Sequence, residues 1–120
     1  MTMTSDLDRH SVIDLTTAGR VTGRPHTIEI WFTSRESTIY LLSGRGERSD
    51  WVRNLTRTPT VTIRVGGREY AGLGRIVTDP HEDRVARDAV HDKYAVRYRG
   101  DLTSWRETAL PIAIDLEHGT

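Results

Sequence analysis

The feature that most limits the fold of this sequence is an alternating segment that ends at two glycines. Apolar residues from Val61 to Val65 alternate with polar ones, and Gly66 and Gly67 separate them from a second strand-like run at 68–77. A period of two is typical of a strand with one buried face, and paired glycines favour a two-residue turn. The segment therefore predicts an antiparallel β-hairpin.

Four other segments have the pattern of strands, which brings the predicted number to six. They are residues 12–17, 27–32, 38–42 and 110–116. In residues 27–32 the alternation places Ile28, Ile30 and Phe32 on one face of the strand. In residues 110–116 we expect Pro111 to lie at the beginning of the strand or on a sheet edge, since proline cannot donate a hydrogen bond to a neighbouring strand.

Two helices are predicted from their capping residues. Ser49 can cap a helix that starts at Asp50, and Pro59 prevents it from continuing. The second start is more complete, with Asp79 as N-cap, proline at the first helical position and glutamate at the third. We expect this helix to run to about Tyr98. The residues expected on its inner face are Val85, Ala89, Val90 and Tyr94. About six mainly antiparallel strands with two main helices favour an α+β barrel.

Length and composition narrow the class of protein. A chain of 120 residues fits one domain, with residues 1–10 expected as an N-terminal arm and 11–120 as the domain. Seventeen basic and seventeen acidic residues leave no net charge to attract nucleic acid or a membrane surface. The sequence has no apolar run of membrane-spanning length and no signal peptide, so we expect a cytoplasmic protein that binds a small molecule.

Few of the common catalytic arrangements fit this sequence. Cysteine is absent, and His81 and His91 have no second ligand at helical spacing, so no metal site is predicted. The sequence contains neither the glycine-serine elbow of hydrolases nor a phosphate-binding loop with lysine. We therefore expect an anionic, aromatic cofactor that brings its own reactivity.

Two segments are candidates for holding such a cofactor. In residues 16–26 two glycines allow the backbone to approach a ligand, and Arg20, Arg24 and His26 can neutralise a phosphate; the alternative is an exposed loop with solvated arginines. In residues 42–55 a glycine-rich stretch leads into a helix where Trp51 and Asn54 can face the same side. The alternative there is that Trp51 belongs to the core.

Together these segments resemble the deazaflavin-dependent nitroreductase family of the flavin and deazaflavin oxidoreductases, whose split β-barrel is shared with pyridoxamine phosphate oxidases. The likeness covers residues 12–116. The matching motifs are Leu15 to His26 with its Thr-Thr-x-Gly-Arg-x-x-Gly pattern, Ser43 with the glycines after it, Asp50 to Leu55, and Trp105 ahead of Leu110-Pro111. The resemblance implies the coenzyme F420 as cofactor, with FMN as the alternative.

The resemblance also implies roles for particular residues. Those implied to bind the cofactor are Thr17, Arg20, Arg24, His26, Trp31, Ser43, Gly44, Arg45, Trp51 and Asn54. Two departures concern the substrate rather than the cofactor. Val21 stands where the prodrug-activating nitroreductase has a lysine, and only Tyr94 and Tyr98 are available in place of its tyrosine-rich lid.

The expected function is that of a reductase which passes a hydride from reduced F420 to a quinone, nitro compound or enone. Ser43 or Arg45 could stabilise charge on the acceptor, and Tyr98 is the candidate proton donor, whereas Tyr94 continues the inner face of its helix and fits packing better. A pyridoxamine-oxidase-like FMN enzyme, a non-catalytic F420 or flavin binder and a domain without a ligand remain alternatives. A homodimer is expected from the split-barrel resemblance.

Overall fold

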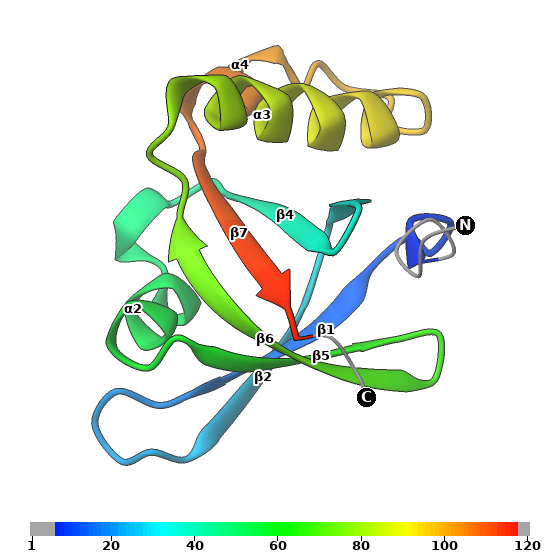
Figure 1. Cartoon of the computed structure of the whole chain (residues 1–120). Coiled ribbons are helices and arrows are strands. Elements are labelled where there is room, and N and C mark those ends of the chain that lie inside the picture. The colour runs from blue at the N-terminus through cyan, green and yellow to red at the C-terminus, as the bar shows by residue number, and fades with distance from the viewer. Residues whose placement is uncertain (1–6, 118–120) are drawn as a thin grey trace.

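Seven strands form one antiparallel sheet in the computed structural model, which describes residues 7–117 (Figure 1). The strands are β1 (Ile13–Ala18), β2 (Pro25–Ile30), β3 (Thr33–Arg35), β4 (Thr38–Ser43), β5 (Thr60–Val65), β6 (Arg68–Ile76) and β7 (Leu110–Leu116). Their order across the sheet is β2-β1-β5-β6-β7-β4-β3. The predicted hairpin is confirmed, because Val65 pairs with Arg68 and both intervening glycines have positive φ angles, 58° and 79°.

The sheet has one strand more than the six segments recognised in the sequence, where about six strands were predicted. Residues 27–32 do not form a single strand, since β2 ends at Ile30 and the chain turns at Trp31 and Phe32. The next three residues, Thr33–Arg35, pair with β4 as the extra strand β3. This strand is short and polar, so it has no apolar alternation by which it could be recognised.

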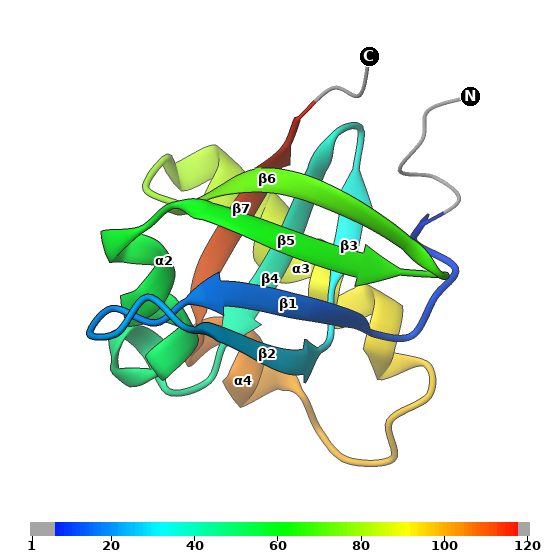
Figure 2. The ribbon, with the colours of Figure 1, turned by 90° about the horizontal axis from the view of Figure 1, so that it is seen from below.

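The sheet curls because its two edge strands are neighbours in sequence. Only Trp31 and Phe32 lie between the end of β2 at one edge and the start of β3 at the other. The edges must therefore come close together, and the views in Figures 1 and 2 show the sheet bent around a common interior. The inside is filled by buried apolar side chains, among them Leu15, Phe32 and Ile114.

A second apolar layer lies on the outer face of β4 and β7. These strands carry Tyr40, Leu42 and Ala113 outward, where they pack against Val90 and Tyr94 of helix α3 (Pro80–Ala95). Both faces of β4 are therefore covered, which explains its nearly continuous apolar sequence. In Figure 1 helix α3 lies across this face together with α4 (Thr103–Thr108), whereas α2 (Asp50–Arg57) lies beside the β1–β2 loop.

Both helices begin at the residues that the sequence predicted, but α3 ends earlier than expected. The Asp79 carboxylate accepts a hydrogen bond from the Glu82 amide at 2.8 Å, as predicted. Helix α3 nevertheless ends at Ala95 rather than Tyr98. Ala86 is buried on its inner face, while Val85 and Ala89 are only half-buried. Ser49 precedes α2 but its hydroxyl makes no capping hydrogen bond and pairs with Ser43 instead.

A group of charged side chains ties α3 to the sheet. Arg75 on β6 forms two hydrogen bonds to Glu82 of α3, at 2.7 and 2.8 Å, and two to Asp115 of β7, at 2.7 and 3.2 Å. The Tyr40 hydroxyl of β4 donates to Glu82 at 2.7 Å. The hydrogen bonds from Arg75, together with that from Tyr40, lower the pKa of Glu82 to about 2. Arg75 also lowers the pKa of Asp115. We call these four residues the Arg75 cluster.

Residues 7–10 of the predicted arm pack against the sheet. Leu7 is 5% exposed and belongs to the interior core. The Asp8 carboxylate accepts hydrogen bonds from the Thr33 hydroxyl, the Ser34 amide and the Lys93 ammonium group, each at 3.1 Å. The first six residues of the arm lie outside the described part of the chain. No helix in residues 7–117 is long and apolar enough to cross a membrane.

Candidate cofactor and acceptor site

The loop between β1 and β2 is a tight turn that displays basic side chains. The Gly19 amide donates to the Arg24 carbonyl at 2.7 Å, and the Gly23 amide donates to the Gly19 carbonyl at 2.8 Å. Gly23 has a φ of 76°, a conformation that favours glycine. The loop borders a cavity of about 420 Å³, which we call the loop cavity. Its lining residues are Gly19, Arg20, Val21, Thr22, Arg24, His26, Asp50 and Asn54.

Helix α2 holds this loop through one buried side chain. The carbonyl oxygen of the Asn54 side chain accepts hydrogen bonds from the Arg20 amide at 3.2 Å and from the Arg20 guanidinium at 3.0 Å. The Asn54 amide group donates to the Thr17 hydroxyl at 3.0 Å. Asn54 is 2% exposed and its polar atoms are engaged within the protein. In this structure Asn54 therefore acts on the loop, whereas the sequence prediction gave it a direct bond to the cofactor.

The three basic side chains of the loop differ in how free they are. Arg20 also forms an ion pair with Asp50 at 3.1 Å, and its side chain is 33% exposed. Arg24 and His26 are exposed, and neither side chain has a hydrogen bond or ion pair within the described part of the chain. The loop cavity therefore offers two uncommitted basic groups and one whose charge is shared with a carboxylate.

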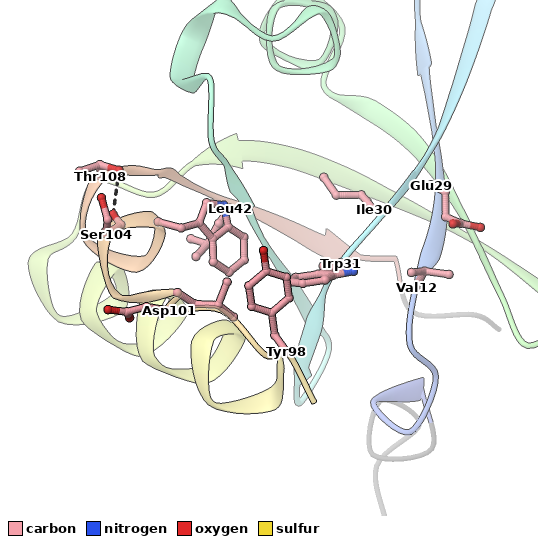
Figure 3. A pocket seen from close by; sticks show the side chains of 11 residues that line it. Val12, Glu29, Ile30, Trp31, Leu42, Tyr98, Asp101, Ser104 and Thr108 are labelled. Atoms are coloured by element: carbon pink, nitrogen blue, oxygen red, sulfur yellow. Dashed lines mark hydrogen bonds between the residues drawn. The ribbon is translucent and has the colours of Figure 1, made fainter. Parts of the chain in front are cut away.

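A larger cavity of about 710 Å³ lies at the Ile30 end of β2, and we call it the aromatic cavity. Its lining residues are Val12, Glu29, Ile30, Trp31, Leu42, Tyr98, Asp101, Leu102, Ser104, Trp105 and Thr108. Figure 3 shows Trp31 and Tyr98 near its centre, with Leu42, Ser104 and Asp101 on one side and Glu29 on the other. Four separate segments of the chain thus meet at this cavity.

Trp31 is the centre of the aromatic contacts. Its ring is stacked on Tyr94 with centroids 4.2 Å apart and planes 4° from parallel. Trp105 approaches it edge-on at 5.8 Å, and Tyr98 does so at 5.9 Å. Such geometries are favourable for aromatic pairs. The wall is therefore composed of flat apolar surfaces suited to a planar, conjugated ligand.

The charge of the aromatic cavity is opposite to that of the loop cavity. Glu29 and Asp101 contribute carboxylates, and no arginine or lysine is among the lining residues. Hydrogen bonds from Thr103 lower the pKa of Asp101, so its carboxylate is ionised at neutral pH. An anionic ligand would meet two like charges in this cavity, whereas neutral and cationic ligands would not.

The segment from Leu42 to Asp50 connects the two cavities, since Leu42 lines one and Asp50 lines the other. Ser43 is 2% exposed, and its hydroxyl donates to the Gly46 carbonyl at 2.9 Å and exchanges a hydrogen bond with Ser49 at 2.8 Å. This hydroxyl is thus committed to the turn that contains the short 3-10 helix Gly46–Arg48. The structure does not place it among the groups lining either cavity.

The remaining predicted residues are distributed between these places. Gly44 lies next to the Trp105 ring, which is 3.6 Å from the position of a Cβ atom on this glycine, but it is not among the residues lining the aromatic cavity. Arg45 is exposed, and its side chain has no hydrogen bond or ion pair to any described residue. Trp51 is half-buried and packs against the interior core. Within residues 7–117 no three histidine or acidic side chains are grouped to hold a metal ion.

Sequence reasoning missed most of the aromatic cavity. Trp105 was assigned no role although it forms one wall, and Leu42 and Asp101 were not singled out. Trp31 and Tyr98 were named, but nothing in their spacing indicates that they meet. The one available signal for the cavity was Trp105 itself, a large aromatic residue in an otherwise short and polar helix.

Comparison with known proteins gives a family and a fold. The sequence profile of the F420H2-dependent quinone reductase family matches residues 2–117. The chain belongs to this family. Its family is thus one of oxidoreductases that use F420, in agreement with the predicted resemblance. No curated protein sequence matches the chain.

Solved structures with the same architecture support the predicted fold class. A provisionally named pyridoxamine 5′-phosphate oxidase from Listeria innocua has a TM-score of 0.70 at 20% identity, covering 95% of this chain and 90% of that one. An F420H2-dependent reductase has a TM-score of 0.70 at 14% identity, with 89% and 94% covered. Another protein described as an F420 reductase has a TM-score of 0.67 at 17% identity, with 95% and 92% covered. The curled sheet is therefore a split β-barrel.

Proposed function

We propose that this member of the family binds F420 with its anionic end at the loop cavity and reduces a conjugated acceptor held in the aromatic cavity. The observation that carries the proposal is the pair of cavities with opposite charge, connected by the segment from Leu42 to Asp50. The basic loop cavity matches the anionic end of F420, and the flat apolar walls of the aromatic cavity match a conjugated acceptor. Quinones, nitro compounds and enones are the acceptor classes proposed.

The donor set at the loop cavity fits the anionic groups of F420. Arg24 and His26 have uncommitted side chains, and Arg45 is a third on the connecting segment. Charge-assisted hydrogen bonds to phosphate are stronger than neutral ones. Because F420 carries acidic groups beyond its phosphate, we expect it to bind more tightly than FMN.

When bound, reduced F420 supplies the hydride for the acceptor. The contribution of the chain is to hold the acceptor against the wall formed by Trp31 and Trp105 and to exclude water around it. Reduction of a quinone to a quinol also needs a proton. Tyr98 lines the cavity and is 49% exposed, so its hydroxyl can both reach an acceptor and regain a proton from solvent.

Ser43 takes a different role in this proposal from the one predicted from sequence. Its buried hydroxyl fixes the turn at Gly46, so we assign it to shaping the connecting segment rather than to acting on the acceptor. The carboxylates of Glu29 and Asp101 make neutral or cationic acceptors the preferred substrates.

The test combines cofactor binding with turnover. Calorimetric titration of the purified protein with F420 and with FMN should give the tighter binding for F420. Arg24→Ala should weaken F420 binding about tenfold or more, which corresponds to one charge-assisted hydrogen bond. Arg64→Ala is the matched control, because Arg64 is also exposed. It lies on β5 opposite Asp14 in the strand register, toward the end of β1 that is far from the loop.

Oxidation of F420H2 by menadione, a neutral naphthoquinone, measures the reaction itself. Binding of F420 without any turnover would favour the non-catalytic binder, and tighter binding of FMN would favour the flavin alternative. Equal F420 affinity in Arg24→Ala and wild-type protein would remove the loop cavity from the proposal.

A further inference from the structure

The two residues that cross between the sheet edges also form part of the aromatic cavity. Trp31 lines the cavity, and Phe32, which follows it, is fully buried in the interior core. Neither residue belongs to a strand, so their backbone groups are not held by the regular pairing of the sheet. The position of the Trp31 ring therefore depends on contacts made elsewhere.

Trp105 and Tyr98 touch the ring edge-on, but one side chain of helix α3 both stacks on the ring and bonds the backbone of the crossing. The Tyr94 hydroxyl accepts a hydrogen bond from the Phe32 amide at 2.8 Å and lies 2.6 Å from the Ser11 carbonyl, to which it donates. It is also 3.0 Å from the Phe32 carbonyl. The ring of the same tyrosine is stacked on Trp31. Tyr94 is 5% exposed, and burial raises its pKa to about 12, so the hydroxyl remains protonated.

We propose that Tyr94 is a positioning residue for the acceptor: its hydroxyl fixes the crossing between the sheet edges, and its ring holds Trp31 as the wall of the aromatic cavity. This inference rests on the proposed function, because it requires that the aromatic cavity bind the acceptor. The hydroxyl touches neither cavity contents nor cofactor in this assignment. Its effect is transmitted through Trp31.

Loss of the hydroxyl should affect one cavity and spare the other. Without it the buried Phe32 amide and the Ser11 carbonyl lose their partner, and the crossing can adopt other conformations. A cavity that is formed for only part of the time has an apparent affinity reduced by that fraction. The loop cavity lies at the Pro25 end of β2, and Trp31 follows Ile30 at the other end, which is roughly 17 Å away along the strand. Binding of F420 at the loop should not change.

The chain offers a matched control for the lost hydroxyl. Tyr40 is buried to a similar degree, its hydroxyl also connects the sheet to α3, and burial with the Glu82 hydrogen bond raises its pKa to about 12 as well. Tyr40 is not among the residues lining the aromatic cavity. Tyr40→Phe therefore reports what a general loosening of α3 does to binding.

The experiment measures menadione binding by equilibrium dialysis in protein without F420, together with F420 affinity by calorimetry. Tyr94→Phe should weaken menadione binding about three- to tenfold, the range expected for one hydrogen bond, and leave F420 affinity unchanged. Tyr40→Phe should change neither. In turnover assays the loss in Tyr94→Phe should appear in KM for menadione more than in kcat.

A double-mutant cycle tests whether Tyr94 acts through Trp31. Trp31→Leu should itself weaken menadione binding, and in that background Tyr94→Phe should have little further effect. Equal menadione affinity in the two tyrosine variants, additive effects in the cycle, or unchanged affinity in Trp31→Leu would each overturn the inference. Wild-type protein that does not bind menadione would overturn it too. Failure of the proposed function is distinguished by absent F420 binding or absent turnover in the wild type.

Discussion

The Arg75 cluster leads to a prediction about the stability of the protein in acid. Glu82 accepts hydrogen bonds from Arg75 and Tyr40, and together they lower its pKa from 4.5 to about 2. A carboxyl whose pKa is lower in the folded state stabilises the fold above its unfolded pKa. That contribution is lost as the pH falls from about 4.5 through about 2. Glu82→Gln removes it at every pH.

The size of the effect follows from the shift in pKa. One unit corresponds to about 1.4 kcal/mol, so the full shift of Glu82 would amount to about 3 kcal/mol. The Glu82 side chain is 22% exposed and that of Arg75 is 41% exposed, so water screens part of the interaction. We therefore expect Glu82→Gln to lower the free energy of unfolding by about 1–2 kcal/mol at pH 7.

Urea denaturation followed by circular dichroism at several pH values between 7 and 2 measures this difference. Carboxyl groups outside the Arg75 cluster titrate alike in both proteins, so the gap between wild type and Glu82→Gln reports Glu82 and its coupling to Asp115, and it should shrink toward zero near pH 2. Glu69→Gln, at an exposed position on β6, is the control and should give no gap at any pH. A gap for Glu82→Gln that stays constant from pH 7 to pH 2 would refute the reasoning.

Four further outcomes are expected from the site. Arg20→Ala should lower the free energy of unfolding by about 0.5–1.5 kcal/mol in urea titrations, whereas Arg24→Ala should not, because only Arg20 is bonded to α2. Asp50→Asn should tighten F420 binding about two- to fivefold at low salt by releasing Arg20, and weaker binding would contradict this. Trp105→Ala should impair menadione binding more than Trp51→Ala in dialysis of folded protein, since only Trp105 is among the residues lining the aromatic cavity. Naphthoquinone-2-sulfonate should have a higher KM than menadione because two carboxylates line that cavity, and equal KM values would argue against the charge preference.

The parts of the fold that were predictable are those with local signals. Gly66-Gly67 determines a turn through its backbone freedom, and Asp79 determines a helix start through a bond to a residue three positions away. Strand β3 had no such signal, because its sequence is short and polar. It is a strand only through its pairing with β4. The end of α3 also lacks a local signal. No residue between Ala95 and Tyr98 forbids a helix, so the sequence predicted a longer one.

The site was predictable where it is contiguous in sequence. The loop from Gly19 to His26 carries its basic residues and its turn in one segment, so the sequence alone indicated its chemistry. Trp31 and Trp105 come from segments far apart, and only the curl of the sheet brings them within 5.8 Å. Asn54 was assigned to the second segment, beside the cofactor ring, and its bonds to Arg20 and Thr17 could not be predicted because they depend on how α2 is placed.

The position of β7 has a consequence for synthesis of the chain on the ribosome. This last strand pairs with β4 on one side and β6 on the other, so it is the strand that joins the two parts of the sheet. Until residues 110–116 leave the exit tunnel, β3–β4 and β2-β1-β5-β6 are two separate pieces with unpaired edges. Such edges can pair with other chains. Ribosome stalling or premature termination before Leu110 should therefore yield an aggregation-prone product rather than a partly active reductase.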